Sequence, residues 1–108
     1  MSVRVDSSSA NAYSSAWPAS MADETVSVPE GSSVFDVLKA LGLTVGGDGT
    51  YVRSINGLSE KACGARSGWI YKVDGDVPKK SCGDYVLAGG EEIVWLYTCD
   101  YVADGYVG

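Results

Sequence analysis

The chain has 108 residues, 45% of them hydrophobic and 20% charged, which fits one globular domain over 1–108 with a modest core. A net charge of −6 with only 8 scattered Lys and Arg argues against a surface for nucleic acid, and the complete absence of His excludes Ser-His-Asp and Cys-His catalysis. No apolar run reaches the ~20 residues that a membrane-spanning helix needs, so we expect no direct membrane insertion.

The N-terminal part of the chain predicts two strands separated by a loop. Val3 and Val5 alternate with polar residues, as in a half-buried strand. The Ser-rich segment 7–23 is predicted to be a loop from its composition, and 25–28 to be the second strand.

One amphipathic helix follows these strands. Ser33 is a suitable N-cap, and Asp36 stands three residues later, as in a capping box. Gly42 marks the expected C-terminal stop. Apolar residues at helical spacing predict that one face of the helix packs on a sheet, and these are Val34, Val37, Leu38 and Leu41.

Three more strands are predicted after the helix. The first ends at Asn56-Gly57, and the second covers Trp69–Val73 and ends at Asp74-Gly75, a strong hairpin signal. Pro78 limits the returning arm to a short or edge position. The segment 91–98 is apolar on both faces and predicts a central strand, before a tail at 99–108.

The element order ββαβββ predicts an α+β protein with a β-grasp (ubiquitin-like) fold, in which one helix packs on a mixed sheet. Several segments resemble, in order, the transcobalamin-like C-terminal domain family of bacterial surface and secreted proteins. They are TVSVPEGSSVFDVLKAL, YVRSINGL, SGWIYKVDGDVP and the Asp84–Leu87 stretch leading to Ile93, Trp95 and Tyr97. That family is similar to the domain that closes the vitamin B12 carriers transcobalamin and intrinsic factor, so the resemblance implies a ligand-binding β-grasp domain.

The same resemblance implies that the hairpin beginning at Trp69 corresponds to the edge of the carrier domain that faces the corrin ring. An apolar, aromatic edge with a few polar groups suits a large, flat, amphipathic ligand. Without His the chain cannot replace an axial ligand of cobalt through imidazole. The given sequence supplies no counterpart of the large helical domain of the animal carriers, so we expect a corrinoid site to include a second domain.

Aromatic and apolar residues on the last strands are the candidate ligand-binding set. Trp69 and Tyr71 share one face of their strand, as do Trp95 and Tyr97 of theirs, and one of these two pairs is expected to be partly exposed. Simple packing across the sheet is the alternative explanation. The predicted site residues are Trp69, Ile70, Tyr71, Tyr85, Trp95 and Tyr97.

Three cysteines allow one disulfide and leave one thiol. We expect Cys63–Cys82, because the Asp74-Gly75 turn would carry Cys82 back toward the loop that holds Cys63. Pairing of either residue with Cys99 remains open, and so does the alternative that the cysteines are reduced and simply buried.

The acidic residues predict neither a metal site nor an active site. Asp74, Asp76 and Asp84 lack the full pattern of a calcium loop, and no Cys spacing fits zinc. Glu91 and Glu92 are adjacent in an expected strand and would point to opposite faces, so they could not act together in acid–base catalysis.

The sequence therefore predicts a non-enzymatic, exported or cell-surface binding module that engages a protein, a glycan or a neighbouring domain. The alternative is a small-molecule carrier module that binds cobalamin or a related corrinoid. No cofactor is expected otherwise. The first residues, MSVRVDSSS, lack the apolar core of a signal peptide, so export would depend on a segment outside this sequence.

Overall fold

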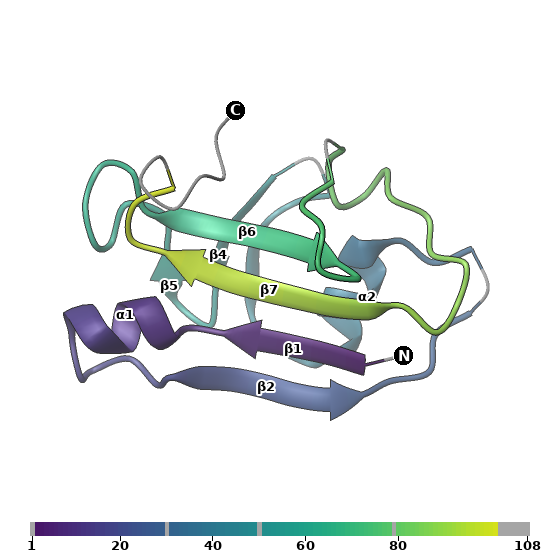
Figure 1. Cartoon of the computed structure of the whole chain (residues 1–108), viewed down its shortest axis with the longest axis horizontal. Coiled ribbons are helices and arrows are strands. Elements are labelled where there is room, and N and C mark those ends of the chain that lie inside the picture. Colours follow the sequence, from purple (N-terminus) through teal and green to yellow (C-terminus); the bar gives the residue numbers. More distant parts are fainter. Residues whose placement is uncertain (1, 30, 50, 79, 102–108) are drawn as a thin grey trace.

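The computed structural model describes residues 2–29, 31–49, 51–78 and 80–101 and contains two short helices and seven strands (Figure 1). In chain order the elements are β1 (Ser2–Asp6), α1 (Ser8–Tyr13), β2 (Ser20–Thr25), α2 (Val34–Ala40), β3 (Val45–Gly47), β4 (Val52–Ile55), β5 (Leu58–Ser59), β6 (Gly68–Val73) and β7 (Glu92–Thr98). No helix in these described ranges has the length and apolar character needed to cross a bilayer. The α+β class is confirmed.

The main sheet has four strands in the order β2-β1-β7-β6 (Figure 1). The two central strands, β1 and β7, run parallel, with Val3 opposite Ile93 and Val5 opposite Trp95. The outer strands pair antiparallel to them. This is a mixed sheet, and its centre carries the apolar segment that the sequence predicted to be central.

The predicted amphipathic helix is confirmed as α2. Ser33 accepts a hydrogen bond from the Asp36 backbone N–H, and the Asp36 carboxylate accepts one from the Ser33 N–H, so the capping box is complete. Gly42, just beyond the helix, has φ of 76°, which suits glycine at a helix C-terminus. The residues that α2 buries fully are Val34, Val37 and Leu38.

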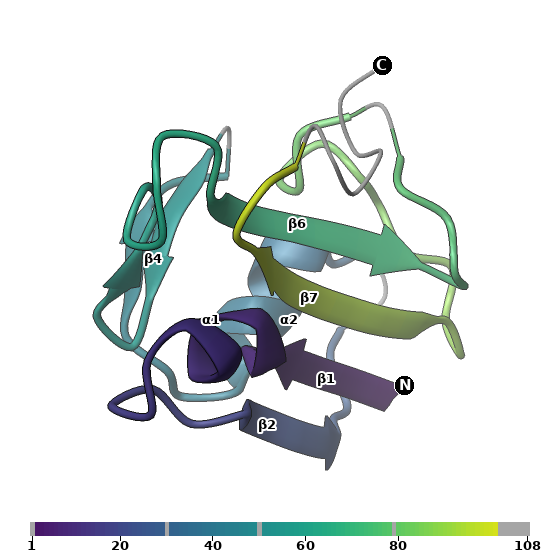
Figure 2. The same cartoon turned by 60° about the vertical axis from the view of Figure 1, so that its left-hand side comes forward.

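A second, three-stranded sheet in the order β3-β4-β5 lies on the same side of the main sheet as α2 (Figure 2). The hairpin between β4 and β5 turns at Asn56 and Gly57, whose φ angles of 51° and 83° confirm the predicted turn. Ile55 and Leu58, on either side of this turn, are fully buried. The core is therefore enclosed between the main sheet, the helix and the second sheet.

The register of β6 against β7 places both predicted aromatic pairs on the same face. Trp69 lies opposite Tyr97, and Tyr71 lies opposite Trp95. Because the second sheet covers this face together with α2, Trp69, Trp95 and Tyr97 are buried and Tyr71 alone is half-buried. We predicted that one of the two pairs would be partly exposed, and in the structure the partial exposure is confined to Tyr71 of the Trp69/Tyr71 pair.

The predicted order ββαβββ was also wrong in three places. The segment 7–23 contains α1 and the beginning of β2, rather than a loop alone. The second strand lies at Ser20–Thr25 instead of 25–28, and the three-stranded sheet was not expected. In β2 the residues are mostly exposed and do not alternate, since it is an edge strand defined by its pairing with β1.

The predicted hairpin at Asp74-Gly75 has the expected turn but no returning strand. Asp74 and Gly75 have φ of 50° and 86°, and the pairing stops at a single bridge between Val73 and Asp76. The chain then leaves the sheet, and β7 takes the place beside β6. Val86 forms only an isolated bridge with Ser33, and residues 102–108 of the predicted tail lie outside the described part.

Candidate functional site

A groove of about 270 Å³ lies between β4, β6 and the segment that leaves the sheet after β6. We call it the aromatic groove. Most of its lining is apolar or aromatic, and the residues are Tyr51, Val52, Trp69, Ile70, Tyr71, Val77, Pro78, Lys80, Ser81, Cys82 and Trp95.

Four of the six predicted site residues line this groove: Trp69, Ile70, Tyr71 and Trp95. The other two do not. The Tyr85 ring packs edge-on against the Tyr71 ring, with 6.5 Å between the ring centroids. Tyr97 packs edge-on against Trp69 at 5.1 Å, and its hydroxyl donates to the Ser59 carbonyl oxygen at 2.7 Å, so it holds β5 against the main sheet.

Sequence reasoning missed the groove residues outside the strands. Tyr51 precedes β4, and Val77 and Lys80 follow the Asp74-Gly75 turn. The Val77-Pro78 pair was the available signal, because an apolar residue and a proline directly after a turn are typical of a segment that leaves the sheet. That Tyr51 and this segment line the same groove depends on tertiary packing alone.

The two tryptophans of the groove differ in the hydrogen bonding of their indole N–H groups. The Trp69 indole N–H donates to the Leu58 carbonyl oxygen at 2.8 Å, which links β6 to β5. Trp95 is only 2% exposed, and its indole Nε1 has no hydrogen-bond partner among the residues that the structure describes. A buried N–H donor without a partner is rare and destabilises a fold by about 1–3 kcal/mol. Trp95 thus lines the groove and also holds a buried donor whose hydrogen-bonding capacity is unused among the described residues.

Tertiary contacts hold the Cys82 side of the groove in place. The Gly83 N–H donates to the Gly49 carbonyl oxygen at 2.7 Å, and the Phe35 N–H at the start of α2 donates to the Cys82 carbonyl oxygen at 3.2 Å. Burial raises the pKa of the Cys82 thiol to about 11, so it stays protonated near neutral pH. The Cys82 thiol on this side of the groove is therefore neutral near pH 7.

The open side of the groove carries its polar groups. The Tyr71 hydroxyl donates to the Lys80 carbonyl oxygen, and burial raises the Tyr71 pKa to about 12. The Lys80 Nζ lies 5.8 Å from the centre of the Tyr85 ring, a cation–π distance. Among the described lining residues, the groove thus combines neutral aromatic surface with the cation of Lys80.

The predicted Cys63–Cys82 disulfide is not present, and no disulfide links any of the three cysteines in the described part of the chain. The prediction assumed that Cys82 returns alongside β6. Instead, the chain leaves the sheet after Asp76, and Cys82 packs with its Sγ 3.5 Å from the Gly49 carbonyl oxygen. Cys63 lies elsewhere, in the loop before β6, beside Cys99 in a shallow pocket.

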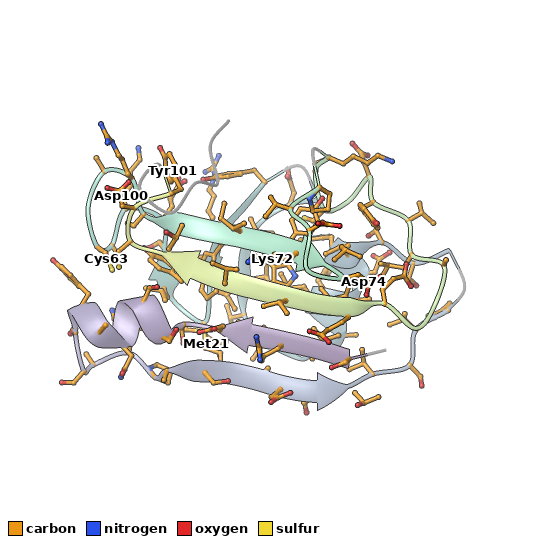
Figure 3. All side chains as sticks on the ribbon, viewed as in Figure 1. Met21, Cys63, Lys72, Asp74, Asp100 and Tyr101 are labelled. Carbon is orange, nitrogen blue, oxygen red and sulfur yellow. The ribbon has the colours of Figure 1, made fainter. Side chains whose placement is uncertain are left out.

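The opposite face of the main sheet has a second hollow of about 420 Å³ with mixed charge. Lys72 projects from this face in Figure 3, and Arg4, Asp6 and Glu92 lie around the same hollow. It contains no buried polar group left without a partner among the described residues. No set of three or more Cys, Asp or Glu side chains within the described ranges could hold a metal ion.

Comparison with known proteins assigns the chain to a family. Residues 31–99 match the model of the family described as "Domain of unknown function (DUF4430)". The chain belongs to this family. The DUF4430 match covers α2, both sheets except β1 and β2, and all residues of the aromatic groove. Comparison with curated protein sequences gives no match.

Among solved structures, the DUF4430 domain has the same fold as part of haptocorrin, in the structure titled "Crystal Structure of Haptocorrin in Complex with Cbi". The TM-score is 0.64 at 19% sequence identity. The alignment covers 91% of this chain and 25% of the haptocorrin chain, so the protein spans about a quarter of the length of that relative.

Proposed function

We propose that this DUF4430 domain is a non-enzymatic binding module, and that the aromatic groove receives a flat, mainly apolar group carrying a hydrogen-bond acceptor. The partner is a protein, a glycan or a neighbouring domain that presents such a group, or a small molecule. The unpartnered indole N–H of Trp95 carries the proposal, since an acceptor at that point would supply its missing hydrogen bond.

The chemistry of the groove agrees with binding rather than catalysis. Apolar area supplies affinity in such sites, and a few placed polar groups supply orientation. Tyr71 and Cys82 are protonated at neutral pH and act as neither base nor nucleophile. Lys80 at the rim would favour a ligand with an electron-rich or anionic edge.

Benzamide and benzene make a matched pair of probes, because they share a ring and differ in the amide acceptor. In ¹⁵N-labelled protein, we expect benzamide to shift the Trp95 indole N–H resonance downfield in a saturable manner, and benzene to shift it less. The resonance is assigned by its loss in Trp95→Phe. The Trp17→Phe variant, at a half-buried residue outside the groove, is the matched control and should leave the response unchanged.

Two results would contradict this proposal. One is an equal response of the Trp95 resonance to both probes, which would show that the N–H meets no acceptor. The other is a larger response at Trp17 than at Trp95, which would place binding outside the groove.

A corrinoid is the second candidate ligand, and the shared fold with part of haptocorrin supports it. The groove volume of about 270 Å³ is just below the ~300–1,000 Å³ of typical small-molecule sites. A corrin ring is larger than such a groove, so this domain would contact one side of the ligand. A second domain would then complete the site, in agreement with the quarter of the haptocorrin chain that the alignment covers.

Calorimetric titration with cobinamide and cobalamin tests the corrinoid proposal. We expect weak, saturable binding that Trp95→Phe weakens about tenfold, the equivalent of one hydrogen bond of about 1.4 kcal/mol, whereas Trp17→Phe binds as the wild type does. No saturable heat at millimolar corrinoid would remove this ligand for the domain alone, without affecting the benzamide result.

We also propose a fold group and a cellular location for the domain. We place the domain in the β-grasp group, close to the transcobalamin-like C-terminal domains, because its two central strands are parallel and one helix packs across the sheet. The resemblance to surface and secreted proteins supports export or display at the cell surface. A protease-accessibility assay on intact cells that express the parent protein tests this location.

A further inference from the structure

Cys63 and Cys99 line the same shallow pocket at the end of the main sheet, away from the aromatic groove. The other lining residues are Gly64, Ala65, Arg66 and Asp100. Figure 3 shows Cys63 and Asp100 together at this end, close to α1. Both cysteines are half-buried, so a soluble reagent can reach them.

Backbone pairing explains why these two residues line one pocket. Gly68 lies opposite Thr98 at the end of the β6–β7 ladder, and the Tyr101 N–H donates to the Arg66 carbonyl oxygen at 2.9 Å. The chain around Cys99 therefore runs beside the residues just before β6.

The loop before β6 turns back on itself and carries Cys63 to the same place. The Cys63 N–H donates to the Ser67 Oγ at 3.1 Å, and the Ser67 N–H donates to the Gly64 carbonyl oxygen at 3.2 Å. The Tyr97 hydroxyl anchors this loop from β7, because it accepts from the Ala62 N–H at 3.1 Å and contacts the Ser67 Oγ at 3.2 Å.

From this juxtaposition we propose that Cys63 and Cys99 form a disulfide in an oxidising environment, and that Cys82 remains a thiol. The bond would tie the loop before β6 to the end of β7 and close the chain over residues 63–99. Cys82 is held at the groove by the Gly49 and Phe35 contacts, so it does not compete for either partner.

A disulfide of the glutathione type is a sufficient oxidant. The thiolate of one cysteine attacks a sulfur of the oxidised reagent, forms a mixed disulfide and releases one glutathione thiolate. The second cysteine then attacks the protein sulfur, closes the Cys63–Cys99 bond and releases a second glutathione. The two protein thiols lose two protons and two electrons, and the reagent is reduced to two thiols. Formation of this bond breaks the weak Sγ–H contact of Cys99 with the Ser9 carbonyl oxygen at 3.4 Å.

The test incubates the reduced, folded chain with oxidised glutathione and counts the thiols that remain after denaturation. We expect the number of free thiols per chain to fall from three to one in the wild type. In Cys82→Ser it should fall from two to zero. Cys63→Ser and Cys99→Ser should form no intramolecular bond. The Cys82→Ser variant is the matched control, because it keeps the proposed pair.

Peptide mapping identifies the linked residues. Trypsin releases Cys63 in the peptide 62–66 but leaves Cys82 and Cys99 together in the peptide that begins at Ser81, so a second cut before Asp84 is needed. A cross-link between 62–66 and the fragment containing Cys99 supports the proposal. A cross-link to the fragment containing Cys82, or three thiols that persist while Cys82→Ser also stays reduced, would overturn it.

Discussion

Replacing Trp69 with Ala should lower the free energy of unfolding by about 3–5 kcal/mol, the range for loss of a buried Trp. Trp69 is 6% exposed, and its ring packs edge-on against Tyr97 at 5.1 Å. Its indole N–H also donates to the Leu58 carbonyl oxygen at 2.8 Å, so the side chain joins the main sheet to the second sheet. The substitution removes both the packing and this hydrogen bond.

Trp69→Phe separates the packing contribution from that of the hydrogen bond. It keeps an aromatic ring and loses only the N–H donor and part of the buried apolar area. We expect Trp69→Phe to lower the free energy of unfolding by about 1–3 kcal/mol. Urea unfolding followed by far-UV circular dichroism is the suitable measurement, since both variants alter Trp fluorescence. If Trp69→Ala lowered the free energy of unfolding by less than about 1 kcal/mol, Trp69 could not be the link between the two sheets.

Gly47→Ala should be the most damaging of the glycine substitutions in the second sheet. Gly47 has φ of 101°, and a Cβ there would lie 2.2 Å from the Tyr51 carbonyl oxygen and 3.0 Å from the Arg53 nitrogen. Both are backbone atoms, and the Tyr51 oxygen already accepts from the Asp48 N–H at 3.1 Å. Backbone strain of about 1–3 kcal/mol adds to a steric cost of about 1–3 kcal/mol.

Gly57→Ala is the matched control for this prediction. Gly57 also has a positive φ, 83°, but a Cβ would meet no atom within 4 Å, so only the backbone preference of about 1–2 kcal/mol is lost. In thermal and urea unfolding, the free energy of unfolding of Gly47→Ala should be well below that of Gly57→Ala. Equal stabilities would mean that the chain around Tyr51 shifts freely. Because Tyr51 lines the aromatic groove, Gly47→Ala should also weaken the benzamide response.

Elements with a strong local signal could be predicted from the sequence. The helix α2 combines a capping box with four apolar residues at helical spacing, and both the box and the packed face are present. The strands β1, β6 and β7 and the Asn56-Gly57 turn were recognisable for the same reason, since alternation and turn chemistry act over a few neighbouring residues.

Elements that depend on distant partners could not be predicted. The strand β2 has exposed, non-alternating side chains and is a strand only because β1 lies beside it. The helix α1 has six residues and no side-chain cap, and its Ala10 is fully buried in the core. Such short elements are stabilised by packing rather than by local propensity.

Only part of the candidate site could likewise be predicted from the sequence. The alternation of Trp69, Tyr71 and Trp95 indicated an aromatic surface, and the structure brings these rings together across β6 and β7. Tyr51, Val77 and Lys80 join them through loops whose paths are set by contacts far away in the chain. The sequence cannot distinguish the satisfied N–H of Trp69 from the unpartnered N–H of Trp95, because that depends on where Leu58 lies.

The amino-acid sequence by itself determined the α+β class, the helix, the central apolar strand and the exclusion of His-dependent catalysis, because composition, periodicity and capping are local properties. Only the tertiary structure decided the strand register, the burial of Trp69, Trp95 and Tyr97, the shape of the groove and which two cysteines line one pocket. These depend on contacts such as Gly68 with Thr98 and Gly83 with Gly49, which join residues far apart in the chain.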